Sequence, residues 1–153
     1  MVILSFLWWS VSVYVPLYAN RTTRENYQVI VYGATPAGIM AAIAAKRSNV
    51  SVLLIEPGAY IGGVIAGGLG RTDIAGPQFI GGLCRDFLNE VASHVPRERQ
   101  SPGRPWDLEP KVAMEVFKTW ITREKIPLRT GMPLKSVSKK NRQITSLTFE
   151  NGA

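Results

Sequence analysis

The sequence is poor in the residues that build disulfides and metal sites. It contains one Cys and one His among 153 residues, and no two cysteines at the spacing of metal ligands. A single Cys excludes an internal disulfide framework, and a zinc site built from Cys and His ligands is excluded as well. Hydrophobic residues make up 46% of the chain and charged residues 19%, which excludes a disordered polar chain. The sequence therefore predicts a folded chain of about one domain in length.

Charge is missing from the N-terminus. Residues 1–19 contain no charged side chain, and a polar stretch, residues 20–26, follows them abruptly. An apolar start of this kind is typical of a secretory signal peptide, and we expect cleavage after Ala19. The alternative is an uncleaved anchor, since about 20 apolar residues can span a bilayer. We therefore expect export to the periplasm or the exterior, with a polar linker at residues 20–26 and membrane attachment only if residues 1–19 are retained.

The second half of the chain lacks a balance of charge. From Arg97 onward the sequence holds 12 Lys and Arg but only 6 Asp and Glu. These basic residues are dispersed and form no dense run with interleaved aromatics, so we interpret them as a solvated surface and expect no nucleic-acid partner. The excess of positive charge is also compatible with an anionic substrate or cofactor.

The pattern after the linker predicts a βαβ unit. Residues Tyr27–Tyr32 and Ser51–Ile55 are short, apolar, β-branched runs that suit buried strands. Between them, Pro36–Arg47 has helical composition, with Pro where a first helical turn tolerates it. Strand, tight turn, helix and strand within about 30 residues predict an α/β fold with a parallel sheet.

The rest of the chain predicts two helices and a hairpin. Apolar residues recur at helical spacing in residues 79–95 and again in residues 111–124. A strand is expected at residues 126–130. The arms of the hairpin are expected at residues 132–138 and 143–149.

A glycine-rich turn follows the first strand. Gly33 and Gly38 are the outer glycines of the GxGxxG dinucleotide fingerprint, with Thr35 at the middle position. Gly33 permits the sharp turn, and Gly38 allows the helix to pack closely on the sheet. The helix start then offers unpaired N–H groups and a partial positive charge to a diphosphate. Thr35 departs from the pattern, because a side chain stands where backbone ordinarily meets the phosphate.

An acidic residue completes the pattern at the end of the second strand. Glu56 lies 23 residues after Gly33, where a carboxylate binds the ribose hydroxyls and repels the 2′-phosphate of NADP. A turn in an ordinary α/β protein is the alternative reading of the glycines alone. Together, the turn, the helix and the acid favour nucleotide binding, with FAD or NAD as the open choices.

The segment VIVYGATPAGIMAAIAAKRSNVSVLLIEPGAYIGGVIAGGLGRTD resembles the N-terminal FAD-binding region of FAD-dependent oxidoreductases, nearest to the branch related to xanthan lyase. Residues 79–83, 106–113 and 144–147 resemble further elements of that branch. The resemblance covers residues 27–153 and implies the N-terminal part of a glutathione-reductase-type FAD domain. Lys111 stands where the branch has His, which leaves any role at that position in doubt.

The resemblance also implies a set of cofactor-binding residues. The turn would line the FAD diphosphate, Glu56 would hold the ribose, and Gly62 with Gly63 would lie beside FAD. Val137, in the first arm of the hairpin, matches a position whose backbone meets adenine. The full set is Gly33, Ala34, Thr35, Pro36, Ala37, Gly38, Glu56, Pro57, Gly62, Gly63 and Val137.

As a function, the resemblance implies hydride transfer through FAD on a small-molecule substrate that the sequence does not identify. Such flavoproteins close their FAD site with a later Gly-Asp segment, which does not follow here. We therefore expect this chain alone to bind FAD poorly and to show no turnover. An NAD-binding domain and a non-catalytic or degenerate nucleotide-binding fragment are the alternatives.

Several other residues carry weaker expectations. Arg71 and Asp73 could approach the flavin ring, where a guanidinium would stabilise the reduced flavin. His94 is expected at a helix end as a partner of the dipole, and Cys84 as a buried structural thiol. Two segments, beginning at Asn20 and Asn49, fit the N-glycosylation pattern and matter only in a eukaryotic secretory route.

Overall fold

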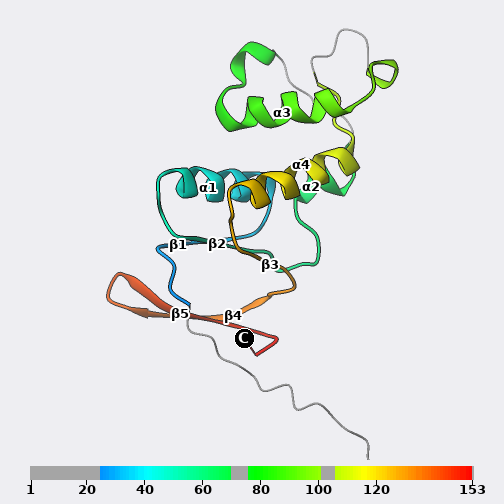
Figure 1. Ribbon diagram of the computed structural model, residues 1–153. Coiled ribbons are helices and arrows are strands. Elements are labelled where there is room, and N and C mark those ends of the chain that lie inside the picture. Colours follow the sequence, from blue (N-terminus) through cyan, green and yellow to red (C-terminus); the bar gives the residue numbers. More distant parts are fainter. Residues whose placement is uncertain (1–24, 70–75, 101–105, 153) are drawn as a thin grey trace, which may run out of the picture.

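A computed structural model describes residues 25–69, 76–100 and 106–152 of the chain (Figure 1). The expected leader, Asn20, Arg71 and Asp73 lie outside these residues. Within the described part of the chain, no helix combines the length and the apolar character needed to cross a membrane.

The expected βαβ unit is present. Strand β1 (Val29–Tyr32), helix α1 (Pro36–Arg47) and strand β2 (Val52–Ile55) follow one another, and the two strands pair in parallel. A two-residue strand, β3 (Leu128–Arg129), extends the sheet in the order β1-β2-β3. The α/β prediction and the bounds of α1 are confirmed, while β3 is shorter than the strand expected at residues 126–130.

Strand β1 is less buried than its apolar sequence predicts. All four residues of β2 are buried, but exposed and covered residues alternate along β1, with Ile30 40% and Tyr32 43% exposed. Helix α1 covers one face of β1. On the opposite face of the sheet, it is Leu53 and Ile55 of β2 that are buried against the start and end of the hairpin.

The segment between β2 and β3 is mainly helical. It comprises α2 (Gly63–Gly67), α3 (Gly82–His94) and α4 (Pro110–Arg123), with short 3₁₀ turns at Pro77–Phe79 and Arg97–Arg99. The glycine-rich stretch carried no helical signal, so α2 was not predicted. Helix α3 begins three residues later than expected, which leaves Phe79 79% exposed. His94 ends α3, as expected.

The main core extends from β2 and α1 through α4 to α3. The Phe87 and Phe117 rings stack at a centroid distance of 4.2 Å, and Trp120 packs edge-on against Phe87 at 5.8 Å. Cys84 is exposed, so the prediction of a buried thiol is wrong. It lies on the same side of α3 as Phe87, one turn earlier in the helix.

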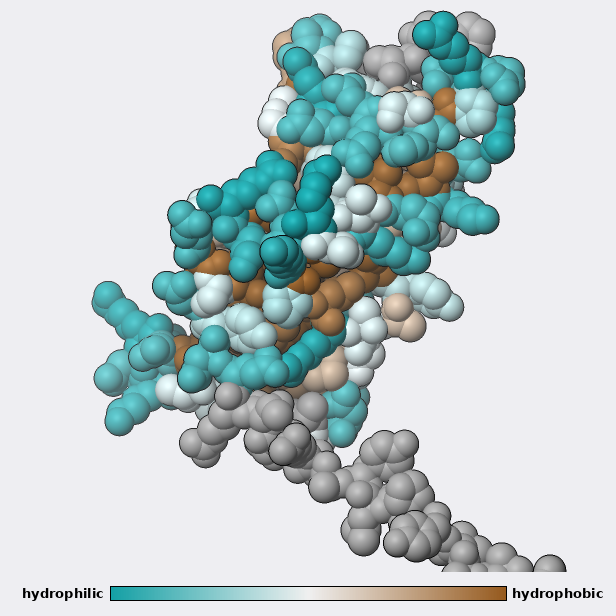
Figure 2. Space-filling view, viewed as in Figure 1, coloured by the Kyte–Doolittle hydropathy of each residue, from teal (hydrophilic) through white to brown (hydrophobic). Residues whose placement is uncertain are grey.

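The hairpin forms a separate layer beneath the sheet (Figure 1). Strands β4 (Leu134–Lys140) and β5 (Gln143–Phe149) pair antiparallel around a turn at residues 141–142. The first arm therefore begins and ends two residues later than expected, while the second arm has the expected bounds. Phe149 and Met132 pack against β2 at the base of the hairpin, while hydrophilic side chains project from its free end (Figure 2).

Candidate functional site

The glycine-rich turn joins β1 to α1 and brings the first turn of the helix into close contact with the end of the strand. Gly33 has φ +105°, and its N–H donates a hydrogen bond to the Ile55 carbonyl at 2.7 Å. A Cβ atom on Gly38 would lie 2.0 Å from the Gly33 carbonyl oxygen, a distance that no side chain can accept. The two outer glycines therefore have the structural roles that the sequence predicts: one makes the turn, and the other lets the helix approach it.

Thr35 fits the turn without strain and caps the helix. Its φ of −67° is ordinary for a residue with a side chain, and Oγ1 accepts a hydrogen bond from the Gly38 N–H at 3.2 Å. A Thr at this position satisfies one of the otherwise unpaired donors of the first turn. Its hydroxyl hydrogen remains available for donation. The side chain thus restricts the backbone's approach to a ligand but offers a donor in exchange.

Glu56 reaches from the end of β2 to the glycine-rich turn. Its Oε2 accepts a hydrogen bond from the Ala34 N–H at 2.8 Å, and its Oε1 accepts one from the Gly58 N–H at 2.9 Å. These two bonds fix the carboxylate beside the start of α1. Because an ionised carboxylate can accept about four hydrogen bonds, it keeps capacity for a ligand's hydroxyl groups. The sequence predicted an acid here but not its bond to the turn.

The double glycine packs directly against the same turn. The Gly62 N–H donates to the Ala34 carbonyl at 2.7 Å, and its φ is +86°. A Cβ atom on Gly62 would lie 2.9 Å from the Phe117 ring, and one on Gly63 would lie 3.2 Å from Pro36 Cδ. Side chains are therefore disfavoured at both positions, by backbone conformation and by space.

The candidate residues lie together, with one exception. The turn, Glu56 with the adjoining Pro57, and the double glycine form one cluster at the N-terminal end of α1, and Ala37 lies in its first turn. Val137 instead lies on the hairpin, paired with Leu147 and 47% exposed. Lys111 is an exposed residue near the start of α4.

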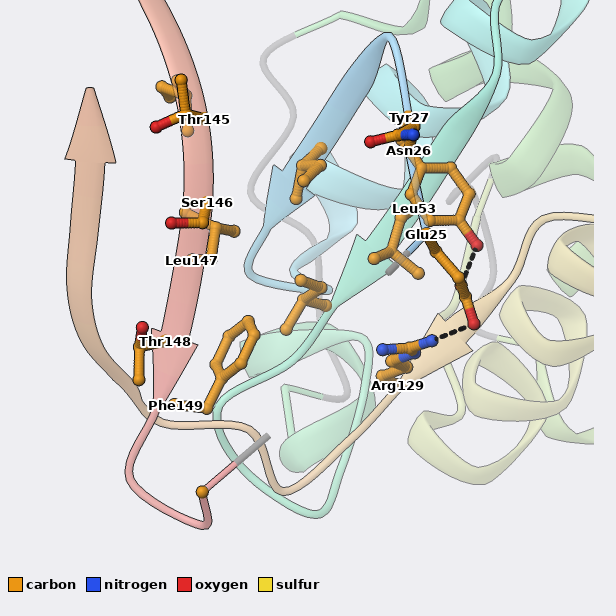
Figure 3. A pocket seen from close by; sticks show the side chains of 14 residues that line it. Glu25, Asn26, Tyr27, Leu53, Arg129, Thr145, Ser146, Leu147, Thr148 and Phe149 are labelled. Carbon is orange, nitrogen blue, oxygen red and sulfur yellow. Dashed lines mark hydrogen bonds and ion pairs between the residues drawn. The ribbon is translucent and has the colours of Figure 1, made fainter. Parts of the chain in front are cut away.

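A concave region lies on the hairpin side of the sheet, away from the glycine-rich cluster (Figure 3). A cleft of about 730 Å³ separates β5 from β1 and β2, and no residue of the cofactor set lines it. At this cleft, Arg129 pairs with Glu25 at 2.7 Å, and the Tyr27 hydroxyl donates to the same carboxylate at 2.6 Å. That hydrogen bond lowers the pKa of Glu25 and raises the pKa of Tyr27.

Sequence reasoning gave the residues of this cleft no role. The lone acid before β1 and the basic residue in β3 are 104 positions apart, so only the folded chain brings them together. The cleft offers no second acid or His to the ion pair, and its floor is apolar, with Ile30, Leu53 and Ile55 among its lining residues. We interpret it as a packing seam between the two layers of the fold.

One family model matches most of the chain. The model of the family described as "FAD dependent oxidoreductase" matches residues 28–153. A thioredoxin reductase from Ureaplasma parvum serovar 3 is 36% identical over 72 residues, which are 43% of this chain and 23% of that protein.

Solved structures share the fold. A bacillithiol disulfide reductase from Staphylococcus aureus superimposes with a TM-score of 0.52 at 19% identity, over 79% of this chain and 33% of that one. A flavin-containing monooxygenase from Stenotrophomonas maltophilia gives a TM-score of 0.54 at 16% identity, over 83% of this chain and 34% of that one. The chain thus spans between 23% and 34% of the length of these relatives.

The family match covers both the glycine-rich cluster and the hairpin, and it favours FAD over the NAD alternative. The chain belongs to the FAD-dependent oxidoreductase family, and its cofactor is FAD.

Proposed function

We propose that this chain supplies the part of a flavin-dependent oxidoreductase that holds the ADP half of FAD. The observation that carries the proposal is the arrangement around Ala34. Its N–H donates to the Glu56 carboxylate, and its carbonyl accepts from Gly62. Three segments separated in sequence are thereby fixed around the start of one helix.

The start of α1 would bind the diphosphate. Pro36 has no N–H to offer, and the Gly38 N–H is directed at Thr35. The donors that remain nearest the helix start are the N–H groups of Thr35 and Ala37 and the Thr35 hydroxyl. Hydrogen bonds to a charged group contribute about 1.5–3 kcal/mol each, and the helix dipole adds attraction for an anion.

Glu56 would accept hydrogen bonds from the adenosine ribose. Its carboxylate is already oriented by two backbone N–H groups, so little conformational freedom would be lost on binding. Such pre-orientation lowers the cost of association. Val137, on the hairpin, would complete the set by meeting adenine through its backbone.

The bound flavin would supply the hydride-accepting chemistry, while the protein supplies binding and orientation. The substrate is a small molecule. Its chemical class stays unassigned, because the structural neighbours are named as enzymes of different kinds, a disulfide reductase and a monooxygenase. The apolar residues 1–19 support the further proposal that the protein is exported.

Flavin titration of the purified chain tests the proposal. We expect FAD to bind more tightly than NAD, and Glu56→Gln to weaken FAD binding about tenfold, which corresponds to roughly 1.4 kcal/mol. Glu115→Gln is the matched control, because this carboxylate is exposed on α4 and pairs with Lys118. Equal FAD affinity in the Glu56 variant and the wild type would contradict the assignment, as would tighter binding of NAD.

The chain spans only about a third of its structural neighbours. We therefore expect weak FAD binding and no turnover from this chain alone. Equilibrium dialysis measures the affinity, and a purified chain that retains yellow flavin with a micromolar or lower dissociation constant would overturn this expectation.

A further inference from the structure

The turn between α1 and β2 carries a sequence pattern that FAD binding does not use. Asn49, Val50 and Ser51 form the Asn-x-Ser acceptor pattern of N-glycosylation. We propose that Asn49 is an N-glycosylation site. This inference rests on the proposed export of the chain, and specifically on a eukaryotic secretory route, where the pattern is modified.

The backbone presents Asn49 at the surface. The residue is exposed and has φ +59°, the left-handed conformation that Asn adopts more readily than most residues. Its N–H donates to the Lys46 carbonyl at 3.0 Å, which closes the turn. Among the described residues, its side-chain amide has no hydrogen-bond partner. Attachment of a sugar would therefore break no contact of the fold.

Ser51 shows when the modification would occur. In the folded chain its hydroxyl accepts from the Gln28 N–H at 2.9 Å and lies 3.3 Å from Gln28 Oε1, to which it donates. The hydroxyl that the acceptor pattern requires is thus engaged at the start of the sheet. Transfer would take place on the unfolded chain during export, before these bonds form.

The position is compatible with cofactor binding. Asn49 follows the C-terminal end of α1, whereas the FAD cluster surrounds the N-terminal end. A helix of 12 residues is about 18 Å long at 1.5 Å per residue. A glycan at Asn49 would extend from the end of the unit opposite the cofactor.

The chemical step needs a lipid diphosphate-linked oligosaccharide as the co-reactant. The Nδ2 atom of Asn49 forms a bond to C1 of the first sugar, and the bond between C1 and the diphosphate oxygen breaks. Nδ2 loses one proton, and the lipid diphosphate leaves and takes up a proton. No oxidant or reductant is involved.

The test is expression of the chain in a eukaryotic secretory cell, followed by digestion with a peptide N-glycosidase and electrophoresis. One arm carries residues 1–153. A second arm carries residues 20–153 behind a leader of proven function. Asn49→Gln and Ser51→Ala each remove the pattern, Ser51→Thr preserves it, and Asn20→Gln removes the other candidate.

In the second arm we expect a glycosidase-sensitive mobility shift that Asn49→Gln and Ser51→Ala abolish and Ser51→Thr retains. No such shift behind the proven leader, or a shift lost only with Asn20→Gln, overturns the site. A shift in the second arm but not in the first shows that Asn49 can accept a glycan but refutes export by residues 1–19, and it thereby overturns glycosylation of the chain with its own N-terminus.

Discussion

The βαβ unit and the hairpin are both built on strands, but the strands differ in composition and reach opposite degrees of burial. All four residues of β2 are buried, whereas six of the seven residues of β4 are exposed. Strand β2 lies between two other strands and beneath a helix, whereas the far end of the hairpin extends beyond the sheet (Figure 1). Composition and position therefore act together, because the apolar strand lies inside the fold and the Lys-rich strand lies at its edge.

The two regions are also held together differently. The βαβ unit depends on contacts between residues distant in sequence, such as Ala34 with Glu56 and with Gly62. The hairpin depends on local pairing around Asn141, whose φ is +56°. Substitutions should therefore be costly in the first region and cheap in the second, which the following experiments can test.

The largest loss of stability is expected where the start of α1 contacts the glycine-rich turn after β1. Gly38→Ala places a Cβ atom 2.0 Å from the Gly33 oxygen, and we expect a loss of roughly 3 kcal/mol or more. Gly67→Ala is the control, since it is also helical and no atom lies within 4 Å of its Cβ. Urea unfolding measures both. Equal stability of the two variants would show that Gly38 and the Gly33 carbonyl are not in close contact in solution.

A matched pair of side-chain truncations, one in each region, compares the regions directly. Leu54→Ala in β2 removes a fully buried side chain and should cost about 2–5 kcal/mol. Ile144→Ala in β5 removes one that is 58% exposed, and we expect a change within about 0.5 kcal/mol. A large loss at Ile144 in chemical unfolding would reveal a contact that its exposure does not predict.

The turn of the hairpin should affect only the hairpin. Asn141→Val places a β-branched residue at a positive φ and should cost about 1–2 kcal/mol locally, whereas Asn141→Gly should be nearly neutral. Hydrogen exchange should become faster at β4 and β5 amides and remain unchanged in β2. Faster exchange throughout the sheet would show that the two layers unfold together.

The smallest effect is expected at the seam between the regions. The Tyr27 hydrogen bond lowers the pKa of Glu25 below its ordinary 4.5, and the same bond raises the pKa of Tyr27 above its ordinary 10.0. The stabilisation is therefore complete between these two ordinary values. It is lost as pH falls through the lowered pKa of Glu25 or rises through the raised pKa of Tyr27.

Glu25→Gln should return the pKa of Tyr27 toward its ordinary value. Tyrosinate absorbance measures the titration, with Tyr27→Phe identifying the signal among the five tyrosines. An unchanged titration would show that the carboxylate is not the partner of Tyr27 in solution.

Local rules in the sequence predicted the bounds of α1. Pro36 suits a first helical turn, and the run of small and apolar residues ends at Arg47, before the turn at Asn49. The need for Gly33 and Gly38 also followed from the motif spacing. These features depend on residues within a few positions of one another, so no knowledge of the tertiary fold was required.

Burial could not be predicted in the same way. Cys84 and Phe87 share one side of α3, but Cys84 is exposed and Phe87 is buried against Phe117 of α4. Ile30 and Leu53 are both apolar strand residues, yet only Leu53 is covered by the hairpin layer. In each case, exposure depends on how far a neighbouring element extends, which is not encoded in the local pattern.

The sequence by itself determined the family, the cofactor motif and the order of elements, because glycine conformation, helix starts and strand composition are local properties. Only the tertiary structure decided that the Glu56 carboxylate binds the Ala34 N–H and that the double glycine packs on the same turn. It also decided which strand faces are covered. These features depend on segments that are distant in sequence and meet only when the sheet and helices have packed.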